Sequence, residues 1–338
     1  MLLSRSSETS TVYSRTPLRI SFGGGGTDFP EYFANRRRGK ILSTAIDQYV
    51  HVNVRQLNSL FDGNFRLQYS EVENCDRIED IRNDIIRGVL LALDWNEKVC
   101  ISVVSDVPGN TGLGSSSAFC VGLISALTRL KGIKLSRIET LAMAVRVELD
   151  ILQRPMGIQD YLPAIFGGTN FFTISSRTNI GLNPVSHDNG IFQDVMSKCY
   201  LIWTGQSRDS SSVLSEQQKS YPKKLKTFDT LAQIAEETYQ IVVANDPEGE
   251  RLFYKKITQG QILKEKFSDN IVSEPAGQVI STLKEVGNNA FRVVGAGNGG
   301  FVLAFLEPEQ YQAFKVASNL KVIKPRVSNS GSQIIYEE

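Results

Sequence analysis

Apolar and polar positions along the chain divide it into recognisable strands and helices. The segment 40–55 alternates and is rich in β-branched and aromatic residues, and 99–107 is a compact apolar run, so both predict strands. Apolar residues at helical spacing predict a helix over 83–94. Further segments predict strands over 65–70 and 168–174 and helices over 118–130 and 136–152. Ser136, followed three residues later by Glu139, has the spacing of a capping box at the start of the last of these helices.

The second half of the chain follows a different pattern. The polar, turn-rich segment 175–189 predicts a domain boundary. After it we expect a helix-rich region over 211–285, a strand pair around a glycine loop over 291–307, a short helix and a last strand. We therefore expect two domains, 1–185 and 186–338.

Composition narrows the class of protein. The chain has 338 residues, of which 41% are hydrophobic and 22% charged, as in an ordinary globular protein. A formal net charge of +1 argues against a nucleic-acid partner, because reading phosphates needs clustered cationic charge. No apolar run approaches the roughly 18 residues of a membrane span, and the first residues do not resemble a signal peptide. Four separated cysteines and two isolated histidines predict neither disulfides nor a zinc site, so we expect a cytoplasmic protein. The sequence leaves a homodimer open.

The stretch GNTGLGSSSAFC, which joins the strand over 99–107 to the following helix, carries the clearest chemistry. Its glycines and Asn110 permit positive φ, and three serines fall at the start of the helix, where unpaired N–H groups and the helix dipole favour anions. We interpret it as a phosphate cradle. The simpler alternative is a glycine turn with a serine N-cap; neither a Walker A loop nor a G-x-G-x-x-G pattern is present. The phosphate-binding residues that we predict are Gly109, Asn110, Thr111, Gly112, Leu113, Gly114, Ser115, Ser116 and Ser117.

Three motifs in order resemble the GHMP kinases, the superfamily of galactokinase, homoserine kinase, mevalonate kinase and phosphomevalonate kinase. They are RTPLRISFGGGGTDFPEYF (15–33), VPGNTGLGSSSA (107–118) and RVVGAGNGGFVLAF (292–305). The resemblance implies an α+β fold with two domains: an N-terminal mixed βα layer domain that binds ATP and a C-terminal ferredoxin-like α/β plait. A Rossmann interpretation of GAGNGG is rejected because a strand, not a helix, follows it.

Several segments point to one branch of that superfamily. FGGGGTDFPEYF, MGIQDYLPAIFGG and WTGQSRDSSSVL resemble D-glycero-D-manno-heptose 7-phosphate kinases, with fucokinases as neighbours. Galactokinases carry G-E-H-T-D-Y where this chain has GGTDF. Gly109-Asn110 departs from the family's usual Pro-Gly, and we expect altered loop mobility rather than lost function. The resemblance implies transfer of a phosphoryl group from ATP, with Mg²⁺, to the anomeric hydroxyl of the heptose phosphate, in the synthesis of nucleotide-activated heptose for surface polysaccharide. Another sugar-1-kinase, or a non-catalytic ATP-binding sensor, remains an alternative.

The resemblance also implies roles for residues of the reaction centre. Ser116, or less favourably Ser115, and Glu148 would bind Mg²⁺; the alternative for Glu148 is an exposed helix carboxylate. Asp160 would be the catalytic base, although a turn-capping aspartate is the alternative from residue type alone. Arg19 matches the position of the family's active-site lysine, and its charge would keep Asp160 ionised.

Substrate contacts are expected from two glycine-rich segments and one arginine. We expect Thr27 and Asp28 to hydrogen-bond sugar hydroxyls, and Arg208 to bind the phosphate that the sugar already carries, because a guanidinium binds phosphate with two hydrogen bonds. Weaker candidates for that phosphate lie at 36–40 and at Arg66 and Arg87. The glycines that we expect to approach the substrate are Gly25, Gly26, Gly297, Gly299 and Gly300.

Overall fold

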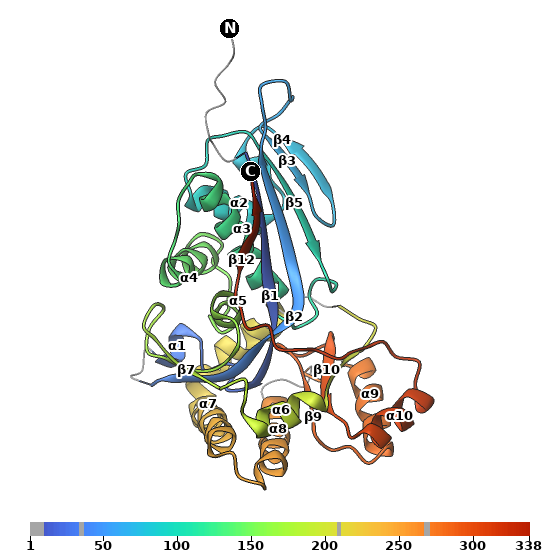
Figure 1. Cartoon of the computed structure of the whole chain (residues 1–338). Coiled ribbons are helices and arrows are strands. Elements are labelled where there is room, and N and C mark those ends of the chain that lie inside the picture. Colours follow the sequence, from blue (N-terminus) through green and yellow to red (C-terminus); the bar gives the residue numbers. More distant parts are fainter. Residues whose placement is uncertain (1–9, 34–36, 208–210, 267–270) are drawn as a thin grey trace.

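Two β-sheets with helices packed against them form the fold in the computed structural model (Figure 1), which describes residues 10–33, 37–207, 211–266 and 271–338. The larger sheet has eight strands and the smaller has four. The predicted α+β class is therefore confirmed. No helix in these ranges is long and apolar enough to cross a membrane.

The larger sheet is mixed. Its strand order is β12-β1-β2-β5-β3-β4, while β6 pairs with the other end of β2 and β7 pairs with β6. All neighbouring strands are antiparallel except β3 and β5, which are parallel. Its strands are β1 (Thr11–Gly23), β2 (Gly39–Gln56), β3 (Phe65–Gln68), β4 (Val72–Cys75), β5 (Val99–Ser105), β6 (Thr169–Ile174), β7 (Ile180–Pro184) and β12 (Gln333–Glu337).

Strand β1 is an interior strand of this sheet, between β12 and β2, and the pattern of the sequence does not predict it. From Thr16 to Gly23 it is buried on both faces, so the alternation that marks a half-exposed strand is lost. Pro17 lies where the register against β2 shifts, which is a position in a strand that tolerates proline. The strand carries Arg19 into the interior, with 3% of that residue exposed.

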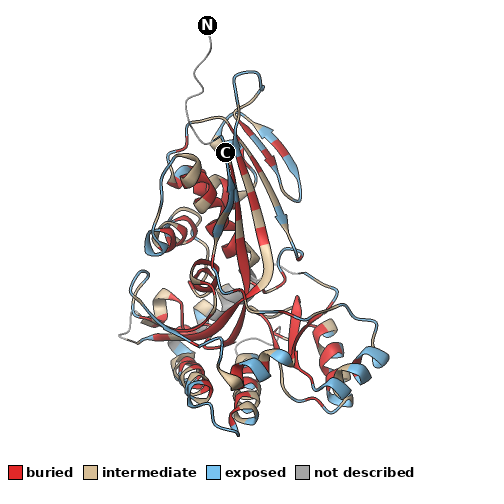
Figure 2. Ribbon diagram, viewed as in Figure 1, coloured by how far each residue is buried: buried red, intermediate tan, exposed pale blue. Residues whose placement is uncertain are grey.

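Helix α3 packs against β1 and β2 and is buried along most of its length, as Figure 2 shows in red. A Cβ atom on its Gly122 would lie 2.8 Å from Oγ1 of Thr16, so the missing side chain permits a close approach to β1. The helices of the first half are α1 (Pro30–Phe33), α2 (Asp84–Ala92), α3 (Ser115–Leu130), α4 (Arg137–Val145) and α5 (Tyr161–Phe166), with a 3-10 turn at Ile78–Asp80.

The second half of the chain supplies long helices and the smaller sheet. Its helices are α6 (Gly190–Ser197), α7 (Ser211–Ala244), α8 (Gly249–Glu265), α9 (Glu274–Glu285) and α10 (Pro308–Ala317). The antiparallel sheet has the order β11-β8-β10-β9, made of β8 (Cys199–Trp203), β9 (Phe291–Val293), β10 (Phe301–Phe305) and β11 (Val322–Ile323). Helix α7 also contacts β1 and β2 of the larger sheet, so the second half of the chain reaches the strand that carries Arg19.

The chain does not change sheets at a single point. Strand β7 lies inside the polar segment 175–189 and still pairs with β6 of the larger sheet. The C-terminal strand β12 returns to pair with β1, and the two run side by side in Figure 1. The division into domains 1–185 and 186–338 stays a prediction, and residues 333–337 pair across it.

Most of the predicted elements are present. The predicted strands correspond to β2, β3, β5 and β6, and the predicted helices over 83–94 and 118–130 to α2 and α3. The capping box of Ser136 and Glu139 is confirmed. The helix predicted over 136–152, however, ends at Val145 and continues as a π-helical turn, Arg146–Ile151. Such turns widen the helix and redirect its side chains.

Candidate active site

A cavity of about 420 Å³ collects most of the predicted site residues. It lies between β1, the loop before α3, the segment before α5 and the glycine loop between β9 and β10. Arg19, Ser116, Asp160 and Gly297 all contribute to its wall although they are far apart in the sequence. The fold therefore brings the three motifs of the sequence to one place.

The phosphate loop has the backbone that its sequence predicts. Asn110, Gly112 and Gly114 have φ values of 57°, 81° and 76°, and α3 begins directly afterwards. The first turn of α3 leaves the N–H groups of its serines without intrahelical partners, and no acidic side chain occurs in that turn. Asn110, Gly112, Gly114, Ser115, Ser116 and Ser117 line the cavity; Gly109 is exposed outside it, and Thr111 and Leu113 are buried beneath the loop.

The C-terminal glycine loop packs directly on the phosphate loop. A Cβ atom on Gly295 would lie 2.5 Å from Cα of Gly112, and one on Gly300 would lie 2.1 Å from the carbonyl oxygen of Thr111. Neither glycine could therefore carry a side chain without separating the loops. Gly297 and Gly299 line the cavity, whereas Gly300 is buried at the contact and is not among the lining residues.

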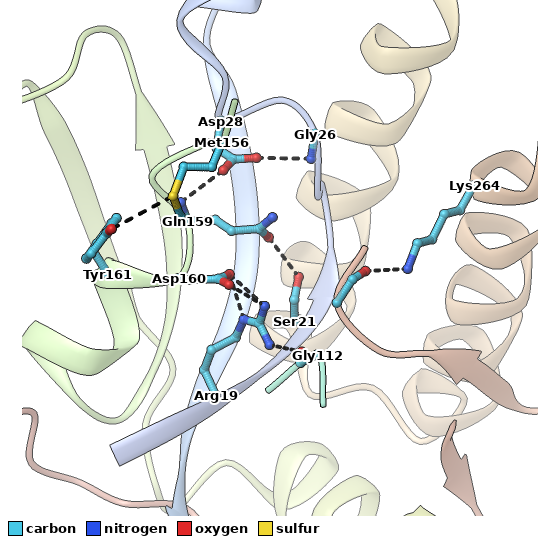
Figure 3. Close-up of polar contacts among 11 residues, drawn as sticks. Arg19, Ser21, Gly26, Asp28, Gly112, Met156, Gln159, Asp160, Tyr161 and Lys264 are labelled. Carbon is cyan, nitrogen blue, oxygen red and sulfur yellow. Dashed lines mark hydrogen bonds and ion pairs between the residues drawn. The ribbon is translucent and has the colours of Figure 1, made fainter. Parts of the chain in front are cut away.

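Arg19 and Asp160, which both line the cavity, form a pair joined by two hydrogen bonds (Figure 3). The Nε and Nη2 atoms of Arg19 donate to the two carboxylate oxygens of Asp160 at 2.8 and 2.7 Å. Arg19 also donates through Nη1 to the carbonyl of Gly112, which ties the pair to the phosphate loop. Asp160 precedes α5 but its side chain makes no capping hydrogen bond, so the turn-capping alternative is wrong. Its side chain is 22% exposed and lines the cavity, where a carboxylate oxygen can accept a proton.

Thr27 and Asp28 lie behind the cavity wall, and neither is among its lining residues. Asp28 accepts hydrogen bonds from the backbone N–H groups of Gly26 at 3.0 Å and Gln159 at 2.9 Å. Burial raises the pKa of Asp28 to about 6, although the N–H of Gln159 opposes the rise. Thr27 donates to the carbonyl of Gly24. In place of the expected contacts with sugar hydroxyls, Asp28 holds the glycine turn against the segment that carries Asp160, and Thr27 holds it against β2, while Gly25 and Gly26 line the cavity.

The predicted metal ligands Ser116 and Glu148 both face Arg154. The π-helical turn places Glu148 inward with none of its surface exposed, so the exposed-carboxylate alternative is wrong; Glu148 lies behind Arg154 and Ser116 and is not itself among the lining residues of the cavity. Nη1 of Arg154 lies 3.2 and 3.0 Å from the oxygens of Glu148 and 3.4 Å from Oγ of Ser116. Nη2 donates to Asp84 at 2.6 Å. Burial raises the pKa of Glu148 although Arg154 opposes the rise.

This arrangement fits a magnesium site by its donor chemistry. The Ser116 hydroxyl and the Glu148 carboxylate both contact the guanidinium of Arg154, a group with positive charge. Two such oxygen ligands can be enough for Mg²⁺, because this ion usually keeps several waters. Ser115 lines the cavity as well but makes no hydrogen bond to Arg154 within the described part of the chain. The guanidinium of Arg154 thus marks a place where positive charge is stabilised.

The arginine that we expected to bind the sugar phosphate, Arg208, lies outside the described residues. The weaker candidates that the structure describes do not line the cavity: Arg37 pairs with Asp229, Lys40 with Glu236, and Arg87 donates to the carbonyl of Ile81, while Arg66 lies on β3. Residue 36 also lies outside the described ranges.

Among the polar lining residues in the described part of the chain, the sequence analysis did not predict Ser21, Asp84, Arg154, Gln159, Lys264 and Arg292. Gln159 is adjacent to Asp160, and Arg292 begins the third motif, so both could have been chosen from their positions. Asp84, Arg154 and Lys264 have no local signal, because only the fold brings them to the cavity. Three of these six side chains are cationic, so the site is more basic than the motifs indicated.

Comparison with known proteins identifies a family pattern in the first half of the chain. The sequence pattern of the GHMP kinases N terminal domain matches residues 83–168. A D-glycero-alpha-D-manno-heptose 7-phosphate kinase of Campylobacter jejuni is 28% identical over 323 residues, which cover 90% of this chain and 92% of that protein. A mevalonate kinase of Thermococcus sibiricus is 23% identical over 268 residues, 75% of each protein.

The fold is shared with solved structures. That of a D-glycero-D-manno-heptose 1-phosphate kinase from Bacteroides thetaiotaomicron has a TM-score of 0.76 at 21% identity, covering 96% of this chain and 99% of that one. The matched region 83–168 contains the phosphate loop, Glu148 and Asp160, and the longer alignments extend over both sheets. Residues 83–168 therefore carry the pattern of a GHMP kinase N-terminal domain, and the chain as a whole resembles GHMP kinases in sequence and fold.

Proposed function

We propose that this kinase transfers the γ-phosphoryl group of ATP to the anomeric hydroxyl of D-glycero-D-manno-heptose 7-phosphate. The observation that carries the proposal is the Arg19–Asp160 pair, which lies in one cavity with the phosphate loop. A GHMP kinase is an ATP-dependent phosphotransferase. The choice of acceptor rests on the likeness to the Campylobacter heptose 7-phosphate kinase and on the GGGGTDF turn beside Asp160.

Phosphoryl transfer depends on alignment and charge neutralisation more than on covalent chemistry. The first-turn N–H groups of α3 and the phosphate loop would hold the β- and γ-phosphates. Mg²⁺, held by Ser116 and Glu148, would neutralise charge on those phosphates when bound. Binding of the metal would require the Nη1 atom of Arg154 to move away from Ser116 and Glu148. The displaced guanidinium could then contact the phosphates of ATP.

Asp160 would receive the proton of the acceptor hydroxyl. The hydroxyl oxygen forms a bond to the γ-phosphorus, the bond from that phosphorus to the bridging oxygen of ADP breaks, and the proton passes to the Asp160 carboxylate. Arg19 keeps this carboxylate oriented through its two hydrogen bonds. The contact of Arg19 with Gly112 would keep the base in register with the γ-phosphate.

The product of this reaction would be the 1,7-bisphosphate, an intermediate toward nucleotide-activated heptose for surface polysaccharide. ATP and sugar phosphates are cytoplasmic metabolites, so we place the protein in the cytoplasm, as a monomer or a homodimer. A fucokinase-like or other sugar-1-kinase is the second candidate, because the cavity wall beside Gly25 would also accept an unphosphorylated sugar.

A panel of acceptors tests the proposal. ADP release should be measured with D-glycero-D-manno-heptose 7-phosphate, mannose, fucose and galactose, each with ATP and Mg²⁺. Turnover of the heptose phosphate with little turnover of the other three is expected. Turnover of an unphosphorylated sugar without turnover of the heptose phosphate would reject the acceptor. No turnover with any acceptor would favour an ATP-binding sensor.

A further inference from the structure

Three cationic side chains that line the cavity lie close enough to one another to interact, and one of them is paired with a carboxylate. They are Arg19, Lys264 and Arg292. The charge of Arg19 lowers the pKa values of the other two. Asp160 uses both of its oxygens on Arg19. Among the described residues, Lys264 and Arg292 form no ion pair with a carboxylate. This part of the cavity therefore holds excess positive charge.

The partners of Lys264 and Arg292 are backbone carbonyls. Lys264, on α8, donates to the carbonyls of Val293 and Gly295, which border the glycine loop; Figure 3 shows it reaching one such carbonyl. Arg292, on β9 and only 7% exposed, donates through Nη1 to the carbonyl of Phe22. A carbonyl satisfies a donor but does not balance a full charge.

The energetics of the two side chains agree with this imbalance. Enclosure lowers the pKa of Lys264 well below its usual value, and Arg292 and Arg19 lower it further. Burial, with the charge of Arg19, lowers the pKa of Arg292 to about 10. Glu265, the next residue in the sequence, raises the pKa of Lys264, but its side chain is exposed to solvent. An anion bound in the cavity would stabilise the charged forms of both side chains.

The position of Arg292 indicates which part of the site this is. Its Nη2 atom would lie 3.8 Å from a Cβ atom built on Gly25, so the guanidinium borders the GGGGTDF turn. Ser21 and Gln159 border the same region and contact each other at 3.3 Å. A fourth cation that lines the cavity, Arg154, instead contacts Ser116 and the predicted metal ligand Glu148. Arg292 is therefore beside the turn expected to hold the acceptor, and Lys264 lies close enough to interact with its charge.

We propose that Lys264 and Arg292 form an anion site that binds the phosphate group already present on the acceptor. The inference rests on the proposed function for the identity of that acceptor, but the site itself requires only a phosphate. Arg292 would offer its free guanidinium edge, and Lys264 a point charge, to the phosphate oxygens. The site would make a phosphorylated sugar a better acceptor than its unphosphorylated form.

Two variants test the anion site, with a matched control on the same helix. Lys264→Gln keeps an N–H donor for the loop carbonyls and removes the positive charge. Arg292→Lys keeps the positive charge and removes the planar guanidinium that can donate two hydrogen bonds to one phosphate. Lys255→Gln, at an exposed position of α8, is the control. The KM for heptose 7-phosphate should rise about 10- to 100-fold in Lys264→Gln, as expected for a lost charged hydrogen bond, and less in Arg292→Lys. The KM for ATP should change less than about 2-fold, and the control should match the wild type.

Binding of inorganic phosphate provides a readout that does not depend on the acceptor. Millimolar phosphate should raise the Tm of the wild type and of Lys255→Gln, and raise it less in Lys264→Gln. If the heptose phosphate is no substrate but this difference appears, the proposed function fails and the anion site stands. A rise in the KM for ATP alone would assign the cations to the nucleotide and overturn the inference. Unchanged KM values and equal protection by phosphate would overturn it too.

Discussion

Replacement of Gly112 by alanine should destabilise the protein and impair ATP binding together. Gly112 has φ of 81°, and a Cβ atom built on it would lie 2.8 Å from the carbonyl oxygen of Val294. The new methyl group would therefore push the phosphate loop away from the C-terminal glycine loop. The carbonyl of Gly112 also accepts a hydrogen bond from Arg19. Because Arg19 is bonded to Asp160, a displaced loop would also shift the Asp160 carboxylate.

The magnitude follows from two separate costs. A left-handed conformation costs a non-glycine residue about 1–2 kcal/mol. Overpacking against a backbone atom that cannot rotate away costs about 1–3 kcal/mol. Together they lower the free energy of unfolding by about 2–5 kcal/mol, which for 338 residues corresponds to a fall in Tm of roughly 3–7 °C.

Gly109→Ala is the matched control in the same loop. Gly109 is exposed, is not among the glycines with positive φ, and has no atom within 4 Å of a Cβ built on it. Its substitution should change stability by less than about 0.5 kcal/mol. Differential scanning fluorimetry and the KM for ATP, measured on both variants, give the comparison. If Gly112→Ala had the same Tm and the same KM for ATP as Gly109→Ala, the close packing of the phosphate loop on the C-terminal glycine loop would be refuted.

Three further predictions concern the charged groups of the site. Asp160→Asn should lower kcat by about 10²- to 10⁴-fold, the usual contribution of a positioned base, while a titration with a non-hydrolysable nucleotide shows unchanged affinity; undiminished turnover would reject the base. Arg154→Met should lower the free energy of unfolding by up to about 3 kcal/mol, because it leaves buried Glu148 without its cation, and Mg²⁺ should restore part of the lost Tm if Ser116 and Glu148 bind the metal; equal responses of both proteins to Mg²⁺ would contradict that site. Asp28, with a pKa of about 6 when folded against 3.8 when free, binds its proton more tightly in the folded state, so the wild type loses stability as the pH rises. Between pH 4 and pH 7 this loss should be about 2 kcal/mol relative to Asp28→Asn, and urea unfolding with a constant difference between the two proteins would argue against it.

Local signals in the sequence explain which features could be predicted. The capping box of Ser136 and Glu139 and the positive φ of Asn110 each depend on a few neighbouring residues, and both are present. The phosphate loop was placed correctly between a strand and a helix for the same reason.

Features that depend on distant parts of the chain could not be predicted in this way. Strand β1 loses its alternation because both of its faces are buried. The π-helical turn that aims Glu148 inward has no marker in a continuous helical pattern. Arg154 and Lys264 enter the cavity only through the packing of elements that are separated by many residues, so their roles required the folded structure.

The role of Asp28 shows how a correct motif can yield a wrong contact. Its position beside glycines in GGGGTDF suggested a side chain facing the sugar. In the structure it is fully buried, and a Cβ atom on Gly157 would lie 1.8 Å from its Oδ2 atom, so its carboxylate fills a space that only glycine leaves. The motif thus contributes to the site by orienting Gln159 and Asp160.

The identity of the phosphorylated oxygen tests the central claim most directly. The protein, incubated with ATP, Mg²⁺ and D-glycero-D-manno-heptose 7-phosphate, should yield a product whose second ³¹P signal couples to the anomeric proton. The same incubation with Asp160→Asn should yield almost none of it. A wild-type protein that binds ATP but forms no phosphate ester on the anomeric carbon of this or any other sugar tested would contradict the account.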